Sequence, residues 1–425
     1  MLRAIARLLN VEERETGAVI AGLLLFFLLF AGYFMLRPVR ETMGVAGGVD
    51  NLQWLFTGTF VATLAALPLF GWLASKVARR RILPWTYGFF VLNLLAFAAG
   101  FLLRPDNLWF ARSFYIWLSV FNLLSISVAW SVLVDVFAAS QAKRLFALMA
   151  GGASLGGLTG PILGTLLVQP IGHAGLLVLS AAMLAASVFA AHYLQRWRDH
   201  HPQPREETAA RRKPLGGNPF AGATAVFKSP YLIAIAVFVL LLSSVTTFLY
   251  FEQARLVAET FSDKTRQTQV FGTIDAVVQG LAILTQVFLT GRVAQKLGVG
   301  VLLVAVPLIV AVGFVWLAMA PTFAVFVVVM VVRRAGEYAF VRPGREMLYT
   351  VVPAEAKYKA KNFIDTVVYR GGDAISAWVK RGLDLVADHP AMAMLIGAGI
   401  ALAWAFTGGL LGRWQRGKEA GNLVS

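Results

Sequence analysis

Long apolar runs, separated by short polar stretches, dominate the hydrophobic pattern of this chain. The runs from Thr16 to Leu36 and from Val299 to Phe323 contain no charged residue. A helix needs roughly 20 largely apolar residues, at about 1.5 Å each, to cross the hydrocarbon core of a bilayer. Runs of this length therefore predict membrane-spanning helices rather than the core of a water-soluble domain.

Twelve such helices are expected, in two groups of six. They lie near 16–42, 51–75, 82–103, 108–137, 146–168, 172–195, 230–252, 268–292, 297–319, 321–350, 361–383 and 390–412. We therefore predict an all-α polytopic membrane protein with a six-helix bundle at 1–195, a polar linker at 196–229 and a second six-helix bundle at 230–425. The first apolar run, 17–36, is too long for a signal-peptide core, so we expect it to stay as the first span.

The composition supports this class. Of 425 residues, 58% are hydrophobic and only 14% are charged, whereas soluble domains carry roughly a quarter of charged residues. The apolar excess must face lipid, because a water-facing surface needs more polar groups. The chain has no cysteine, which excludes disulfides and thiolate metal sites.

The net charge of +16 is distributed in short basic runs between the apolar segments. Examples are Arg79–Arg81, Arg211–Lys213 and the lysines at 357, 359 and 361. These runs fall in alternate loops, which is the positive-inside pattern and not a basic face for a phosphate backbone. We therefore expect no nucleic-acid partner, and we place both termini and the linker in the cytoplasm of a bacterial inner membrane.

An internal repeat relates the two halves. Gly-Trp-Leu-Ala-Ser-Lys-Val-Ala-Arg-Arg-Arg at 71–81 follows the second span, and Gly-Arg-Val-Ala-Gln-Lys-Leu-Gly at 291–298 follows the eighth. Both resemble the signature of the major facilitator fold at this loop, although Ser75 stands where the signature has an acid. The resemblance implies two six-helix halves that rock around a site at the membrane midplane.

Four glycines in the fifth span, at 152, 156, 160 and 164, are spaced by four residues and so share one helix face. Such a stripe lets two helix backbones approach closely. It fits either tight static packing or a surface that slides during transport.

Charged residues inside spans are costly and usually face a cavity or a partner. They concentrate in the first, fourth, seventh and tenth expected spans, which line the central cavity in the major facilitator fold: Arg37, Arg40, Glu41, Arg112, Asp135, Glu252, Arg333, Arg334, Glu337, Arg342, Arg345 and Glu346. Arg37 and Arg40, like Arg342 and Arg345, lie three apart, so each pair is expected to share a face. Paired guanidinium groups suit a multivalent anion. The alternative is internal ion pairing, because eight intramembrane arginines accompany eight acids.

The segments Leu-Arg-Pro-Val-Arg-Glu at 36–41 and Phe-Val-Arg-Pro-Gly-Arg-Glu-Met at 340–347 resemble the ATP:ADP antiporter family, and most closely its bacterial branch of facilitator-type transporters. The resemblance places Arg40 and Arg345 at two lysines that are important for nucleotide exchange in that family. Arg342 stands where the family has an aspartate, and its fourth-span glutamate has no counterpart near Ser119 to Asn122. The resemblance thus implies the fold and the transporter class more directly than the substrate.

We therefore predict a secondary transporter, with no enzymatic activity, for an anionic and phosphorylated or nucleotide-like solute. Arg37, Arg40, Arg342 and Arg345 are the predicted substrate contacts. Glu41, Glu252, Glu346 and Asp365 are the predicted coupling or charge-balancing residues, with a proton or a counter-substrate as coupling partner.

We expect no cofactor and no metal, because neither a phosphate-binding loop nor a His-Glu-x-x-His pattern occurs. The lipid bilayer is the expected environment, and a monomer is the expected state. Two alternatives stay open at this point: a proton-coupled exporter or flippase of amphipathic or lipid solutes, and a membrane subunit without transport activity.

Overall fold

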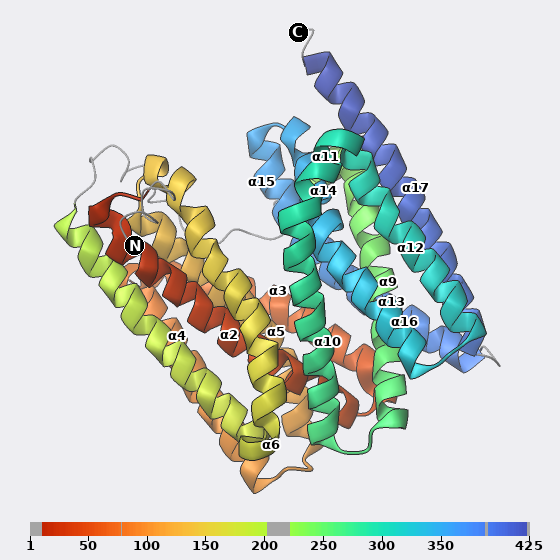
Figure 1. Ribbon diagram of the computed structural model, residues 1–425, viewed down its shortest axis with the longest axis horizontal. Helices are drawn as coiled ribbons and strands as arrows, with labels where there is room; N and C mark the ends of the chain where they lie inside the picture. The colour runs from red at the N-terminus through yellow and green to blue at the C-terminus, as the bar shows by residue number, and fades with distance from the viewer. Residues whose placement is uncertain (1–10, 78, 202–221, 387–389, 423–425) are drawn as a thin grey trace. The chain divides into compact units, whose positions relative to one another are not determined.

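The computed structural model describes residues 11–77, 79–201, 222–386 and 390–422, and all regular structure within them is helical (Figure 1). Nine helices in this part of the chain are long and apolar enough to cross a membrane. One of the nine, Arg144–His200, consists of two helices joined at Gly172. Two further long helical stretches, 323–351 and 354–386, carry more charge. Together they account for the twelve predicted spans.

The described residues form two compact units. The first unit holds the described residues within 1–43, 65–217 and 263–276, and the second holds those within 44–64, 218–262 and 277–425. The predicted bundles divide the chain once, at the central linker. The compact units differ from that division in two segments, because 44–64 packs within the second unit and 263–276 packs within the first.

The first unit is built from four helices, α2 (Thr16–Ala46), α4 (Arg79–Leu103), α5 (Leu108–Val136) and α6 (Ala139–His200). Parts of two others complete it: the second half of α3 (Leu52–Lys76) and the start of α10 (Lys264–Thr285). The φ angle of 67° at Gly172 lies in the left-handed region that glycine adopts without steric cost, and it separates the two helices of α6. The core is aromatic and aliphatic, with Phe26, Phe114 and Phe121 buried.

The glycine stripe of α6 packs directly on the backbone of α2. A Cβ atom added at Gly156 would lie 2.6 Å from the carbonyl oxygen of Phe27, and one at Gly160 would lie 2.6 Å from that of Ala31. No real Cβ approaches an oxygen so closely, so these positions require glycine. The stripe therefore fixes α2, the helix that carries Arg37 and Arg40, against α6.

The second unit contains the remaining described helices: α8 (Ala223–Lys228), α9 (Pro230–Thr260), α11 (Gly291–Leu297), α12 (Val299–Met319), α13 (Phe323–Gly336), α14 (Arg342–Leu348), α15 (Ala354–Phe363), α16 (Tyr369–Val386) and α17 (Pro390–Asn422). Helix α17 packs against α12 and α9, and α16 packs against α9 (Figure 1). Buried Phe238 of α9 and Trp404 of α17 meet in this core at 5.7 Å between ring centroids.

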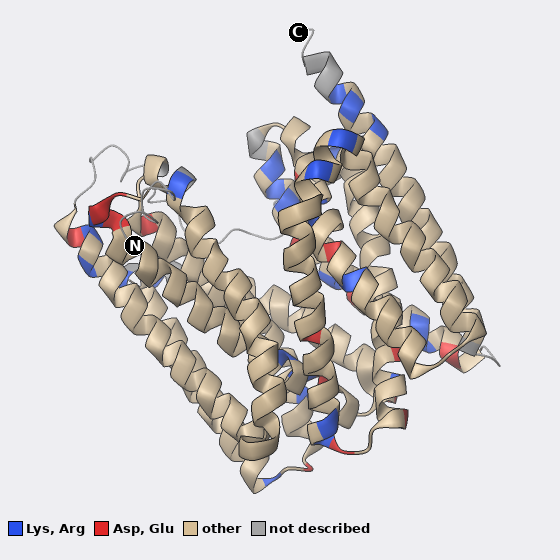
Figure 2. Ribbon diagram, in the orientation of Figure 1, with Lys and Arg blue, Asp and Glu red and all other residues tan. Residues whose placement is uncertain are grey.

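Three short π-helical segments interrupt the long helices of the second unit, at Gln286–Thr290, Glu337–Val341 and Ile364–Val368. A π-turn widens the helix locally and often marks a functional position. Two of the three hold charged residues singled out from the sequence, Glu337 and Asp365. Figure 2 shows that most residues of the helices are uncharged and that many of the charged residues lie near helix ends.

Most predicted spans match the observed helices closely, and the differences lie at basic segments. Lys357, Lys359 and Lys361, predicted to lie in a loop, belong to helix α15. The twelfth helix continues about ten residues past the predicted end, to Asn422. Long lysine and arginine side chains tolerate a helix at the membrane surface because their charged ends reach water. Of the predicted linker, 202–221 lies outside the described residues, and its two flanks are helical.

Candidate functional site

Arg40 lies near the end of α2 and is held by several neighbours within the first unit. Its Nε donates to the carbonyl oxygen of Tyr115 at 3.2 Å, and its guanidinium carbon lies 3.8 Å from the centroid of the Tyr115 ring. Its Nη1 pairs with Oε1 of the adjacent Glu41 at 3.1 Å. Only 16% of the Arg40 side chain is exposed. A cation stacked on a ring and paired with a buried carboxylate is firmly positioned.

Arg37, one turn earlier on α2, contacts a different acid. Its Nε lies 3.8 Å from Oδ2 of Asp275 on α10, which is an ion pair without ideal hydrogen-bond geometry. The buried Asp275 side chain therefore has a positive charge close to it. The two arginines share α2, as the spacing predicted, but each has its own carboxylate.

A hydrogen-bonded chain links three helices beside these arginines. The hydroxyl groups of Thr42 and Thr268 lie 2.7 Å apart, and Nε2 of His173 lies 2.9 Å from the Thr268 hydroxyl. The chain joins α2, α10 and α6 in the first unit. No sequence pattern indicates this chain, because the partners are more than 90 residues apart.

In the second unit, Arg333 on α13 is almost completely buried. Its Nη1 donates to Oε2 of Glu337 at 3.0 Å and to the hydroxyl of Thr246 on α9 at 2.9 Å. Glu337 begins the π-helical segment, and it is buried as well. The contact with Thr246 joins α13 to α9, and the contact with Glu337 occupies one oxygen of that buried carboxylate.

Arg342 uses the other oxygen of Glu337, and more loosely. Its Nη2 lies 3.4 Å from Oε1, and its guanidinium carbon lies 4.3 Å from the centroid of the Tyr338 ring. The side chain is 55% exposed, and Glu337 is its acidic partner among the described residues. Since a guanidinium group has five N–H donors, Arg342 retains capacity to bind an anion.

The next predicted residues form two further ion pairs. Arg345 on α14 contacts Asp365 of the third π-helical segment, with Nη2 3.2 Å from Oδ1. Glu346 accepts from Lys361 at 2.6 Å, in a pair that is partly exposed. Arg342 and Arg345, expected to act together on one anion, are therefore bound to different acids in this structure.

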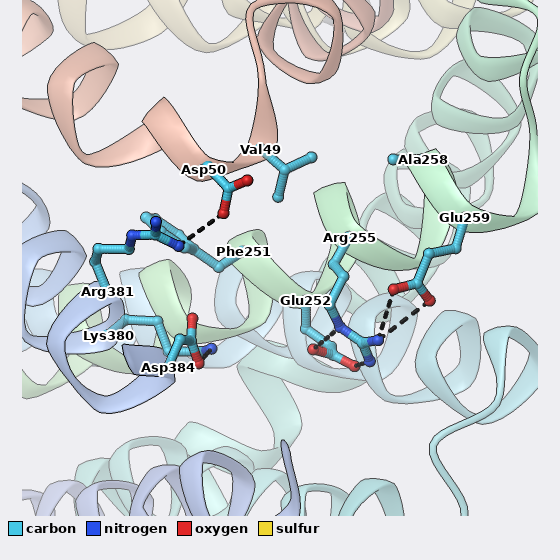
Figure 3. Close-up of a pocket in the computed structure, with 10 residues that line it drawn as sticks. All are labelled: Val49, Asp50, Phe251, Glu252, Arg255, Ala258, Glu259, Lys380, Arg381 and Asp384. Carbon is cyan, nitrogen blue, oxygen red and sulfur yellow. Dashed lines mark hydrogen bonds and ion pairs between the residues drawn. The ribbon is translucent and has the colours of Figure 1, made fainter. Parts of the chain in front are cut away.

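Glu252, near the end of α9, is buried and bound by Arg255 through both of its oxygens. The remaining guanidinium nitrogen of Arg255 contacts both oxygens of Glu259, at 2.9 and 3.1 Å. These residues line a cavity in the second unit (Figure 3). Arg342 is not among the residues that line it.

The clusters have two consequences for the sequence predictions. Each predicted arginine lies beside an acid, as expected from internal ion pairing, and Arg342 is the most exposed of the four. Tyr115 and Tyr338, which the predictions did not include, both stack on arginines. Tyr338 lies four residues before Arg342, a helical spacing that could have indicated this contact, whereas Tyr115 comes from another span. Among the described residues, no group of three or more His, Asp or Glu could hold a metal ion.

Comparisons with known proteins identify the fold. Solved structures similar to the chain include a point mutant of the nucleoside transporter NupG, with a TM-score of 0.68 and 14% identity, covering 93% of this chain and 99% of that one. A bacterial homologue of the human lysosomal transporter Spinster has a TM-score of 0.59 and 14% identity, covering 96% and 98%. The human organic anion transporter MFSD10 (TETRAN) has a TM-score of 0.58 and 15% identity, covering 93% and 100%.

Sequence comparison gives the family. Multidrug resistance protein 3 of Bacillus subtilis (strain 168) is 21% identical over 187 residues, which are 42% of this chain and 35% of that protein. The chain thus matches only about a third of the length of this curated relative. The model of the Major Facilitator Superfamily matches residues 22–356, which include the arginine-rich helices of both units. With this match over most of its length, the chain is a multi-pass membrane protein that belongs to the Major Facilitator Superfamily.

Proposed function

We propose that this protein is a secondary transporter of the bacterial inner membrane for a small anionic solute, and that Arg342 makes the first contact with the anion. The proposal rests on the exposure of Arg342 and on its weak pairing with Glu337. Its side chain is 55% exposed, and its pairing with Glu337 is long at 3.4 Å. An exposed guanidinium group with spare donors on an intramembrane helix is the chemistry that captures carboxylates or phosphates.

The charges around Arg342 favour an anion over a cation. The stretch from 333 to 346 holds four arginines, at 333, 334, 342 and 345, and two glutamates, at 337 and 346. The glutamate nearest to Arg342 already accepts from buried Arg333 at 3.0 Å. The stretch therefore has an excess of positive charge, which an incoming anion would reduce.

The other predicted contacts have a different role in this proposal. Arg40 and Arg345 are engaged by Glu41 and Asp365, so they reach the solute only when those ion pairs open. Such an exchange of partners would couple anion binding to a change of helix position, as alternating access requires. Either a proton on Asp365 or a second anion could drive the exchange. A phosphorylated or nucleotide-like solute carries enough negative charge to contact several of these arginines at once.

Transport into proteoliposomes tests the proposal. We expect concentrative uptake or exchange of one or more members of a panel of inorganic phosphate, glucose 6-phosphate, ADP and succinate, with uncharged uridine as the comparison solute. Arg342→Ala should lower the initial rate at least tenfold, because each charge-assisted hydrogen bond to the anion is worth about 1.5–3 kcal/mol. Arg342→Lys should retain part of the rate.

Arg104→Ala is the matched control, because Arg104 is an exposed arginine outside the cluster. It should transport at the rate of the unmodified protein. Transport of uridine alone, or full anion transport by Arg342→Ala, would refute the anion assignment.

The second candidate is proton-coupled export of amphipathic solutes. The similarity to multidrug resistance protein 3 favours it, together with the buried carboxylate of Glu252. In this case a proton gradient should drive efflux of a lipophilic dye such as ethidium from vesicles, and Glu252→Gln should abolish the dependence on the gradient. Efflux that keeps its proton dependence in Glu252→Gln would count against this candidate.

A further inference from the structure

A cavity of about 460 Å³ lies within the second unit, where the ends of α9 and α16 meet the segment before α3 (Figure 3). Its volume falls in the range of small-molecule sites, roughly 300–1,000 Å³. Seven of its ten lining residues are charged: Asp50, Glu252, Arg255, Glu259, Lys380, Arg381 and Asp384. A membrane protein with 14% charged residues concentrates charge in this way at a functional position.

The segment before α3 and the first residues of α3 are fixed to α16 by three contacts, so this wall of the cavity is defined. Arg381 donates to Asp50 at 2.7 Å, and the indole of Trp378 donates to the hydroxyl of Thr57 at 3.1 Å. The rings of Trp54 and Trp378 meet edge to face at 4.9 Å between centroids. All of these residues belong to the second unit.

Lys380 provides an available cation on the α16 wall. The residue is 4% exposed, and among the described residues its acceptor is Oδ1 of Asp384, one turn later on the same helix. An ammonium group has three donors. Burying it with a single acceptor is unfavourable unless a further acceptor enters the cavity that it lines.

The α9 wall has the opposite character. Figure 3 shows Glu252, Arg255 and Glu259 together on one side of the cavity, away from Lys380 and Arg381. Two carboxylates share one guanidinium group here. Glu259 receives only one nitrogen of Arg255 and is partly exposed, so its oxygens can accept further donors.

We propose that this cavity binds a small zwitterion, in which a short chain joins an ammonium group to a carboxylate or phosphate. The acidic group accepts from Lys380, and the ammonium group donates to Glu259. A simple anion fits less well, because four carboxylates and three cations line the cavity. The site is separate from Arg342, and so it is additional to the proposed transport site.

Two sources supply this chemistry, a free solute and the headgroup of phosphatidylethanolamine. Isothermal titration calorimetry on the full chain in detergent, without lipid, measures the free solute. We use phosphoethanolamine and 4-aminobutanoate as probes, with butanoate and butylamine as analogues that each lack one charge. We expect both zwitterions to bind at least tenfold more tightly than either analogue.

Two variants test the assigned residues. Lys380→Met keeps the aliphatic stem and removes the buried charge, and water can hydrate the carboxylate of its partner Asp384, whose side chain is 33% exposed. We expect it to raise the Kd for phosphoethanolamine tenfold or more, and we expect Glu259→Gln to raise it severalfold. Lys228→Met, at an exposed lysine on α8, should leave the Kd unchanged.

Competition distinguishes the two sources. In nanodiscs of phosphatidylglycerol, adding phosphatidylethanolamine should displace phosphoethanolamine if the headgroup is the ligand, and should leave its binding intact if a free solute is. The proposal fails if neither zwitterion binds, if butanoate binds as tightly as 4-aminobutanoate, or if Lys380→Met binds like the unmodified protein. None of these results bears on transport by Arg342.

Discussion

Arg40 in the first unit and Arg342 in the second have the same kinds of neighbour, but they differ in how tightly they are bound and how exposed they are. Each guanidinium group lies over a tyrosine ring, at 3.8 and 4.3 Å, and each contacts a glutamate, at 3.1 and 3.4 Å. Arg40 also donates to a backbone carbonyl and is 16% exposed, whereas Arg342 is 55% exposed. The same residue types thus form a tightly held buried pair in one unit and a loose, exposed pair in the other.

The difference has a local cause. Glu41 gives its contact to Arg40, while Glu337 is shared between Arg342 and the buried Arg333. A buried guanidinium group competes more strongly for the carboxylate, because no water is available to replace the carboxylate as its hydrogen-bond partner. Arg342 is therefore left with the longer contact and the exposed position.

The largest expected effect comes from removing the shared acid. Glu337→Gln leaves the buried charge of Arg333 uncompensated, so the free energy of unfolding should fall by about 3–5 kcal/mol. Thermal unfolding in detergent measures this. The double variant Arg333→Met/Glu337→Gln should recover most of the loss. A single variant as stable as the unmodified protein would show that Arg333 does not depend on Glu337.

The second prediction concerns how the helices that carry the two arginines are held. Gly160→Ala places a Cβ 2.6 Å from the carbonyl oxygen of Ala31 on α2, and backbone cannot move aside cheaply. We expect a loss of about 1–3 kcal/mol in the free energy of unfolding.

Gly344→Ala, beside Arg345 on α14, is the matched control. Its new Cβ would lie 3.0 Å from Cβ of Leu302 and 3.1 Å from Cδ2 of Leu303, and shifts of a few tenths of an ångström relieve these contacts. Since alanine is a better helix former than glycine by about 1 kcal/mol, this variant should be near neutral. Equal destabilisation by both substitutions would contradict the close backbone packing of α6 on α2.

The third prediction tests the two arginines directly. Arg40→Ala removes a charge-assisted contact to Glu41 and leaves that buried carboxylate without it, so the free energy of unfolding should fall by about 1.5–3 kcal/mol. Arg342→Ala should lower it by less than about 1 kcal/mol, because exposed ion pairs contribute little. Chemical unfolding of both variants provides the comparison. Equal losses would mean that Arg342 is structural, and this would remove the basis of the transport proposal.

The smallest effect is expected at Glu346. Its pair with Lys361 is partly exposed on both sides, so Glu346→Gln should change the free energy of unfolding by less than about 1 kcal/mol. High salt should reduce the difference further, since it screens exposed charges. A loss above 2 kcal/mol in the same unfolding assay would contradict this assignment of an exposed, weakly stabilising pair.

The spans were predictable because lipid imposes a simple rule on sequence. A backbone in hydrocarbon must satisfy its own hydrogen bonds, so each apolar run of sufficient length becomes a helix. The stretches 321–350 and 361–383 were predicted as spans although they carry many charges, because apolar residues separate those charges, whereas most of α15 was not predicted to be helical. The π-helical segments at Glu337–Val341 and Ile364–Val368 were not predictable, since they arise where helices adjust to their neighbours.

The sequence by itself determined the twelve helices, the two-part plan and the concentration of arginines and acids on a few spans. Only the tertiary structure decided which of those charges are available. Arg40 meets a carbonyl 75 residues away, and Arg333 meets a threonine 87 residues away in the opposite direction along the chain. A buried charge is stabilised by the partners that packing brings within about 3 Å, and for Arg40 and Arg333 one of these partners comes from another helix. For this reason four arginines equivalent in sequence differ in the structure, and Arg342 is the one left most exposed.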